Sequence, residues 1–144
     1  MNEPPTRELL AGPEPLSLDG LTVIKNFLGK THADARRMFA ERVGWRGFST
    51  EDFMWMAPEG LRYYLVPAQE YLCAEESADD WEFCHGLLCS LSFQAKEGGL
   101  PHDLLRRIRE IADYADAHRA RYLIETPDDD LFNEYVQEIR KASG

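Results

Sequence analysis

The sequence predicts an all-α fold, an irregular single-domain bundle of six or seven helices with an extended N-terminal arm. Apolar residues recur at spacings of three and four from Leu18 onward, which is the period of one helix face. No clean two-residue alternation extends over six or more residues, so no strand is clearly indicated. Residues that favour helix ends, such as Ser, Thr, Asp, Pro and Gly, stand between the apolar stripes.

The first 16 residues differ from the rest of the chain in composition. They hold Pro4, Pro5, Pro13 and Pro15, half of the eight prolines in a chain of 144 residues. Proline fixes φ and lacks the N–H that regular structure needs, so residues 1–16 are expected to form a flexible arm. Residues 17–144 have the length of one domain and are expected to form a single helical domain.

Two segments follow the arm. Residues 21–28 fit either a helix or a strand, because Thr22, Val23 and Ile24 are β-branched. Thr31 is expected to cap a helix, since its hydroxyl accepts hydrogen bonds from the N–H groups of a first turn. The expected buried face of that helix consists of Ala35, Met38, Phe39 and Val43.

The middle of the chain carries two further helix starts. Ser49 or Thr50 would cap one helix, whose first turn is acidic, as the helix dipole favours. Pro58 suits the first position of the other helix, and Pro67 is expected to kink or restart it. The expected core residues of this region are Leu61, Tyr64, Leu65, Ala68 and Leu72.

Three helices are expected in the last half of the chain. Ser77 would cap the first, and Gly98-Gly99 would end it. Pro101 would open the second, and Thr126-Pro127 would start the third. The expected buried stripes are Trp81, Cys84, Leu88 and Leu91 in the first helix, Leu104, Leu105, Ile108, Ile111, Ala112 and Ala115 in the second, and Leu131, Phe132, Tyr135, Val136 and Ile139 in the third.

The charge balance excludes some classes of partner. The chain carries 26 Asp and Glu against 16 Lys and Arg, a net charge of −10, whereas a nucleic-acid binder needs a basic face. No apolar run approaches the roughly 20 residues that span a bilayer, and the start Met-Asn-Glu-Pro-Pro lacks the features of a signal peptide. We therefore expect a cytoplasmic protein with no nucleic-acid or membrane partner.

No pattern predicts a metal site or a cofactor. Cys73, Cys84 and Cys89 form no Cys-x-x-Cys unit and are expected to be small, buried, unpaired residues in a reducing compartment. Glu82 and His85 form one Glu-x-x-His pair, whereas carboxylate-bridged di-iron bundles need that pair twice. The sequence contains no nucleophile elbow and no phosphate loop, so an enzyme is not the expected class.

One stretch of the chain concentrates the negative charge. Residues 63–95 contain no Lys or Arg and have a net charge of −6. Asp79, Asp80 and Glu82 suit the start of a helix, but Glu75 and Glu76 fall near the end of the preceding helix, where the dipole favours cations. This stretch is either a solvated acidic loop that keeps the protein soluble or a surface that binds a partner.

A second unusual segment runs from residue 51 to residue 58. Phe53 and Met56 share one helix face, and Trp55 falls off that face. Trp55 either packs against another helix or forms an exposed anchor beside acidic residues, as in protein interfaces. The predicted partner-binding residues are Glu51, Asp52, Trp55, Glu75, Glu76, Asp79, Asp80 and Glu82.

A resemblance to other proteins is found in residues 51–65 and in the Pro67-Ala68 pair that follows. Residues 51–65 read E-D-F-M-W-M-A-P-E-G-L-R-Y-Y-L. With the upstream residues 26–30 and Ala35, this segment resembles a group of small uncharacterised bacterial helical proteins, a domain of unknown function, over residues 25–90. That group has Leu-Pro-Ala where Val66 intervenes here. The resemblance implies an α-helical bacterial cytoplasmic domain, and small acidic proteins of this kind are, by analogy, often immunity or antitoxin proteins.

The expected function is therefore that of an acidic protein-binding domain. It would act as an immunity- or antitoxin-like inhibitor whose acidic face covers a basic partner, such as a toxin. Two alternatives stay open. One is an accessory or scaffold homodimer joined through Trp55 and Trp81, and the other is an enzyme with a carboxylate site or a Glu82–His85 site.

Overall fold

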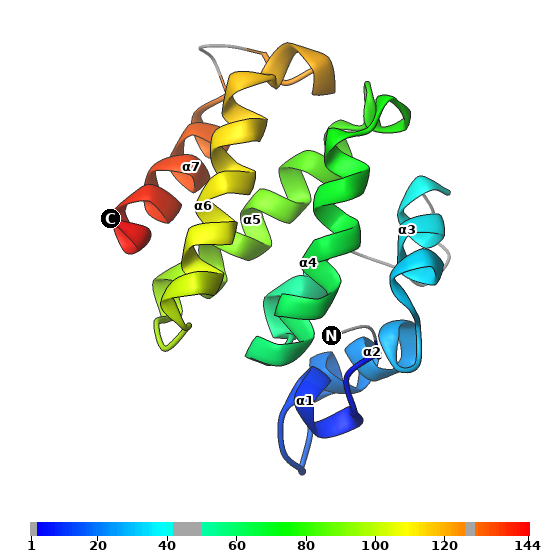
Figure 1. Cartoon of the computed structure of the whole chain (residues 1–144). Coiled ribbons are helices and arrows are strands. Elements are labelled where there is room, and N and C mark those ends of the chain that lie inside the picture. The colour runs from blue at the N-terminus through cyan, green and yellow to red at the C-terminus, as the bar shows by residue number, and fades with distance from the viewer. Residues whose placement is uncertain (1–2, 42–49, 126–128) are drawn as a thin grey trace.

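The structure is a computed structural model that describes residues 3–41, 50–125 and 129–144 (Figure 1). These ranges contain helices and no strand, which confirms the all-α prediction. The α-helices are α1 (Arg7–Ala11), α2 (Leu18–Phe27), α3 (His32–Ala40), α4 (Pro58–Cys73), α5 (Trp81–Glu97), α6 (His102–Ala117) and α7 (Asp130–Ser143). Three 3-10 helices are η2 (Thr50–Trp55), η3 (Glu75–Ser77) and η4 (Arg119–Tyr122).

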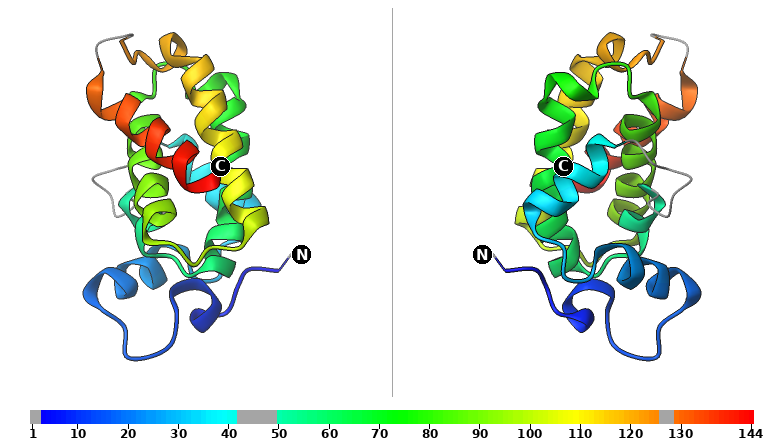
Figure 2. Two further views of the ribbon diagram at one scale, coloured as in Figure 1. Left: turned by 90° about the vertical axis from the view of Figure 1, so that its left-hand side faces the viewer. Right: turned by 90° about the vertical axis from the view of Figure 1, so that its right-hand side faces the viewer.

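The four long helices α4 to α7 form the body of the fold (Figure 1). α5 packs against α7 and η2, α6 packs against α7, and α3 packs against α4. α1 and α2 lie at one end of this body, and the α4–α5 connection and η4 lie at the opposite end, as both views in Figure 2 show. The bundle therefore has two well-separated ends.

Aromatic side chains join α2, α3, η2 and α4 in the core. The ring of Phe27 contacts the rings of Phe39, Phe53 and Tyr64, with centroid distances of 6.3, 5.8 and 4.8 Å. The Tyr64 hydroxyl lies 2.7 Å from the carbonyl oxygens of both Phe27 and Lys30. Carbonyls at a helix end lack partners within the helix, so α4 supplies the donor that the end of α2 needs. Burial raises the pKa of Tyr64, which keeps this hydroxyl protonated.

Part of the N-terminal arm is helical rather than extended. Residues 7–11 form α1, which Thr6 caps, and Leu10 is fully buried. The carbonyl of Leu10 accepts a hydrogen bond of 2.8 Å from the backbone N–H of Ala57. This close approach depends on Gly60, because a Cβ there would lie 2.6 Å from the Leu10 carbonyl oxygen. The prolines therefore bound a short helix that is packed on α4.

Most of the predicted helix ends agree with the structure. Thr31 caps α3 in a reciprocal capping box with Asp34. Pro58 is the first residue of α4, and Gly98, with a φ of 79°, ends α5. The ambiguous segment 21–28 is helical and belongs to α2 up to residue 27, with Ser17 as its cap.

Some predicted helix ends are wrong, and others fall on residues that the structure does not describe. Asp80, not Ser77, caps α5, and Pro67 lies inside α4, which continues through it to Cys73. Thr50 begins a 3-10 helix rather than an α-helix. Asp129 caps α7. Val43, Ser49 and the Thr126-Pro127 start lie outside the described residues.

Two side chains expected in buried stripes are exposed. Trp81 is 52% exposed and Leu131 is 55% exposed. Trp81 is the first residue of α5, and helical side chains tilt toward the helix N-terminus. The Trp81 side chain therefore projects beyond the start of its helix. Cys84 and Leu88, which belong to the same predicted stripe, are buried in the core as expected.

Candidate functional site

Four of the five predicted acidic residues that stay exposed lie at one end of the bundle. Glu75, Glu76, Asp79 and Glu82 are all exposed, and they occupy the α4–α5 connection and the first turn of α5. This connection lies beside η4, at the end opposite to α1 and α2 (Figures 1 and 2). We call these four residues the acidic end.

The backbone under the acidic end is held by specific hydrogen bonds. The Ser77 hydroxyl is buried and lies 2.9 Å from the carbonyls of Leu72 and Ala74. Asp79 has a φ of 66° and donates its backbone N–H to the carbonyl of Arg121 over 2.8 Å. Asp and Asn tolerate this left-handed conformation better than most residues. The exposed carboxylates are therefore carried by an ordered turn.

Asp80 is a structural residue rather than a partner-binding one. Its side chain is buried, and it accepts hydrogen bonds from the Phe83 N–H at 3.2 Å and from the Tyr71 hydroxyl at 2.6 Å. These contacts start α5 and tie it to α4. The predicted binding role of Asp80 is therefore corrected: its carboxylate is turned into the fold.

The structure also explains why acidic residues follow the end of α4. The guanidinium of Arg121 donates to the carbonyl of Ala74, and the Tyr122 hydroxyl donates to the carbonyl of Leu72 over 2.5 Å. Arg36 of α3 forms an ion pair with Glu76. Arg121 and Tyr122 thus satisfy carbonyls at the electronegative helix end, and Arg36 pairs with the charge of Glu76. All three donors are distant in the sequence, so sequence spacing does not reveal these contacts.

Large apolar side chains are exposed at the same end. Trp81 starts α5, Leu123 follows η4 and is 63% exposed, and Leu131 lies in the first turn of α7. Trp81 packs edge-on to His85, and the ring of His85 lies 5.4 Å from the ring of Tyr135 in α7. Trp81 and Leu131 fit the spacing of buried stripes, so the sequence predicts both as buried, and Trp81 is expected as a surface contact only in the homodimer alternative. Sequence reasoning missed Leu123, which lies in a connection.

The predicted residues in η2 do not join the acidic end as a group. Asp52 is buried and accepts a hydrogen bond of 2.7 Å from the Asn26 amide. Trp55 is half-buried, and its ring lies 5.5 Å from that of Phe93. Glu51 is exposed next to Thr50, which packs against Gly86, one turn along α5 from Glu82. Glu51 therefore stays exposed on η2, which packs against α2 as well as α5, whereas Asp52 and Trp55 serve the packing of η2.

The candidate catalytic and metal-ligating side chains have mainly structural surroundings. His85 Nε2 lies 3.5 Å from the Asp129 carboxylate, and no ion pair between His85 and Glu82 occurs in the described structure. A hydrogen bond with Cys89 and burial raise the pKa of Tyr135 to about 12. Over residues 3–41, 50–125 and 129–144, no group of three or more His, Cys, Asp or Glu is placed to hold a metal ion.

The three cysteines are unpaired, as expected, but only Cys84 is fully buried. Burial raises the pKa of the Cys84 thiol, so this group stays neutral. Cys73 is exposed at the end of α4, which corrects the expectation that all three are buried. Cys73 faces outward because Leu72, its neighbour, occupies the core side of the last turn.

Within the described ranges, no helix combines the length and the apolar character needed to cross a bilayer. Comparison of the chain with protein-family models, curated proteins and solved structures gives no match. The candidate site therefore rests on the geometry of the acidic end and its exposed apolar neighbours.

Proposed function

We propose that the chain is a cytoplasmic protein-binding domain whose acidic end covers a basic partner, in the manner of an immunity or antitoxin protein. The observation that supports this proposal most is the exposed Trp81 side chain beside four exposed carboxylates on an ordered turn. Leu123 and Leu131 add exposed apolar surface at the same end. Protein interfaces combine such large apolar anchors with a polar rim.

The negative charge of the chain favours a basic protein as the partner. The net charge of −10 disfavours nucleic acid, whose phosphates would be repelled. A basic protein surface would be attracted to the acidic end, and opposite charges speed the encounter and select the partner. Trp81 would then supply the desolvated contact at the centre of the interface.

Packing and charge disfavour the homodimer alternative. Trp55 is packed against Phe93 inside the chain, so it is not presented for self-association. A symmetric contact through Trp81 would place the four carboxylates of one copy against those of the other, and like charges repel across an interface. We expect a monomer at low salt, measured by light scattering, and a dimer with a salt-independent mass would contradict this.

The direct test uses two sets of variants in a capture experiment from the native host. The first set neutralises the acidic end with Glu75→Gln, Glu76→Gln, Asp79→Asn and Glu82→Gln. The matched control removes the same charge from exposed sites outside the acidic end, at the far end of α5 and on other segments: Glu8→Gln, Glu41→Gln, Glu97→Gln and Glu110→Gln. We expect a basic protein that is retained by the wild type and by the control set and is lost by the acidic-end set.

Trp81→Ala tests the apolar part of the surface separately. The side chain is mostly exposed, so its removal leaves the fold intact. An anchoring Trp at the centre of an interface is worth about 2 kcal/mol or more, which weakens binding roughly 30-fold. A captured partner that binds the Trp81→Ala and acidic-end variants as tightly as the wild type would contradict the proposal.

A further inference from the structure

A second candidate site lies away from the acidic end, where the N-terminal segment crosses the first half of α4. Residues of the segment 3–9, the start of α3, α4 and α6 line a half-open pocket of about 160 Å³. Tyr63 and Val66 come from α4 and Leu9 from α1, and they give the pocket an apolar wall. The pocket exists because α1 is docked on α4 through Leu10 and Gly60.

His32 gives this pocket a polar group that needs a partner. Its ring lies over the ring of Tyr63, with a centroid distance of 3.9 Å and an interplanar angle of 36°. The Nε2 atom is shielded from solvent and has no hydrogen-bond partner within the described part of the chain. Buried polar atoms in folded proteins are nearly always paired. A bound oxygen atom would satisfy Nε2.

Two arginines also line the pocket, and their surroundings differ. Arg62 is neutralised by Glu59 at 2.5 Å and by Asp103 at 3.0 Å. Arg107, which is half-buried in α6, forms no ion pair over residues 3–41, 50–125 and 129–144. Glu3 also contributes to the lining, but it is exposed and is not paired with Arg107. Arg107 therefore provides a guanidinium that forms no ion pair with any carboxylate of the described residues.

We propose that this pocket binds a small organic carboxylate whose apolar part is about the size of one aromatic ring. A cavity of roughly 150 Å³ holds benzene, so the volume suits such a group against Tyr63, Val66 and Leu9. A guanidinium matches the geometry of a carboxylate with two parallel hydrogen bonds. Arg107 would bind the carboxylate, and His32 would share a hydrogen bond with one of its oxygens.

Benzoate is the probe for the test, with benzyl alcohol and benzylamine as the neutral and cationic comparisons of similar size. Binding to the full chain is measured by calorimetry and by the ¹⁵N chemical shifts of the His32 imidazole. We expect saturable binding of benzoate, a shift at His32 Nε2, and affinity for benzoate at least about tenfold above that for either comparison molecule.

Substitution of the arginine separates a specific site from general attraction. Arg107→Gln is expected to weaken benzoate binding about tenfold or more, and Arg107→Lys, which keeps the charge, is expected to weaken it less. Arg106→Gln is the matched control, because Arg106 is exposed on the same helix and does not line the pocket. The control is expected to bind benzoate as the wild type does.

Three results would overturn the pocket proposal. They are the absence of saturable benzoate binding up to about 10 mM, equal affinity for benzyl alcohol, and an equal loss in the Arg106→Gln and Arg107→Gln variants. The pocket shares no residue with the acidic end. Failure of this proposal would therefore leave the protein-binding proposal in place, and the reverse also holds.

Discussion

At the scale of single residues, small side chains and buried polar groups fix how the segments meet. Gly60 allows the backbone of α1 to touch α4, and Asp80 serves as the cap of α5 and as the acceptor for Tyr71. Gly60 acts through Leu10 of α1, and Asp80 acts through the buried hydroxyl of Tyr71 in α4. Neither partner is evident from the local sequence. The sequence predicts the cap of α5 at Ser77, whereas in the structure Asp80 is the cap and also binds the buried Tyr71 hydroxyl.

Gly60→Ala tests the contact between α1 and α4. The new Cβ would lie 2.6 Å from the carbonyl oxygen and 2.8 Å from the Cα of Leu10, and neither backbone atom can move without displacing α1. We expect a loss of about 1–3 kcal/mol in the free energy of unfolding, measured by urea denaturation. Gly20→Ala in α2 is the control, because its nearest contact would be an ordinary 3.4 Å. A Gly60→Ala variant as stable as Gly20→Ala would show that α1 is not docked there.

At the scale of elements, the sequence predicts the helices better than it predicts their contacts. The caps at Thr31 and Pro58 and the end at Gly98 rely on local chemistry, so short-range reasoning finds them. The hydrogen bond of Asp79 to Arg121 and the ion pair of Glu76 with Arg36 depend on the tertiary arrangement. For this reason the acidic residues at 75–82 could be predicted as a group, but the burial of Asp80 and the exposure of Trp81 could not.

Leu10→Ala tests whether α1 belongs to the fold. Leu10 is fully buried, so its truncation is expected to cost about 2–5 kcal/mol in the free energy of unfolding. Leu18→Ala makes the same chemical change at a side chain that is 84% exposed, and we expect little effect. Urea denaturation of both variants measures their free energies of unfolding. Equal stabilities would support a flexible arm instead of a docked helix.

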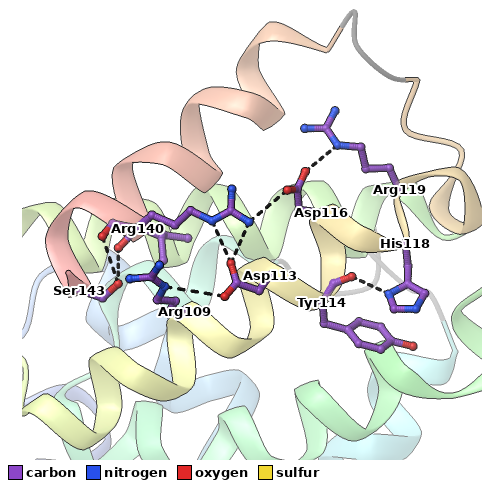
Figure 3. Close-up of polar contacts among 9 residues, drawn as sticks. Arg109, Asp113, Tyr114, Asp116, His118, Arg119, Arg140 and Ser143 are labelled. Atoms are coloured by element: carbon purple, nitrogen blue, oxygen red, sulfur yellow. Dashed lines mark hydrogen bonds and ion pairs between the residues drawn. The ribbon is translucent and has the colours of Figure 1, made fainter.

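A network of charged groups connects α6 to α7 (Figure 3). Arg140 of α7 donates to Asp113 at 2.9 Å and to Asp116 at 3.1 Å, and Arg119 donates to Asp116 at 2.9 Å. Partial burial opposes the ionised form of Asp116, but the hydrogen bonds from Arg119 and Arg140 outweigh it and lower its pKa. The ionised carboxylate is thus the form that stabilises the contact between the two helices.

This lowered pKa predicts a pH dependence of stability. A group with a lower pKa in the folded state stabilises the fold above its unfolded pKa of about 4 and loses this effect as pH falls through the folded pKa. Asp116→Asn removes the titrating group. We expect the wild type to be more stable than Asp116→Asn at pH 7 and the difference to shrink steadily below about pH 4. Urea denaturation across this range measures the difference, and a constant difference would contradict the assignment.

At the scale of the whole molecule, the two ends of the bundle differ in chemistry. One end combines four exposed carboxylates with exposed Trp81, Leu123 and Leu131, and the other carries the pocket that Arg107 lines. The long helices α4 to α7 separate the two ends (Figure 2). Charge, which the sequence gives directly, predicts the class of partner, whereas the position of the surface depends on the fold.

The most direct test of the central claim is the salt dependence of association between this chain and the basic protein that it captures. Surface plasmon resonance would compare the wild type, the acidic-end set and the matched control set from low to high salt. Because salt screens exposed charges, the association rate of the wild type and of the control set is expected to fall about tenfold or more. The acidic-end set is expected to associate slowly at every salt concentration. A rate that falls equally with salt in both variant sets would show that the partner is attracted to another part of the surface.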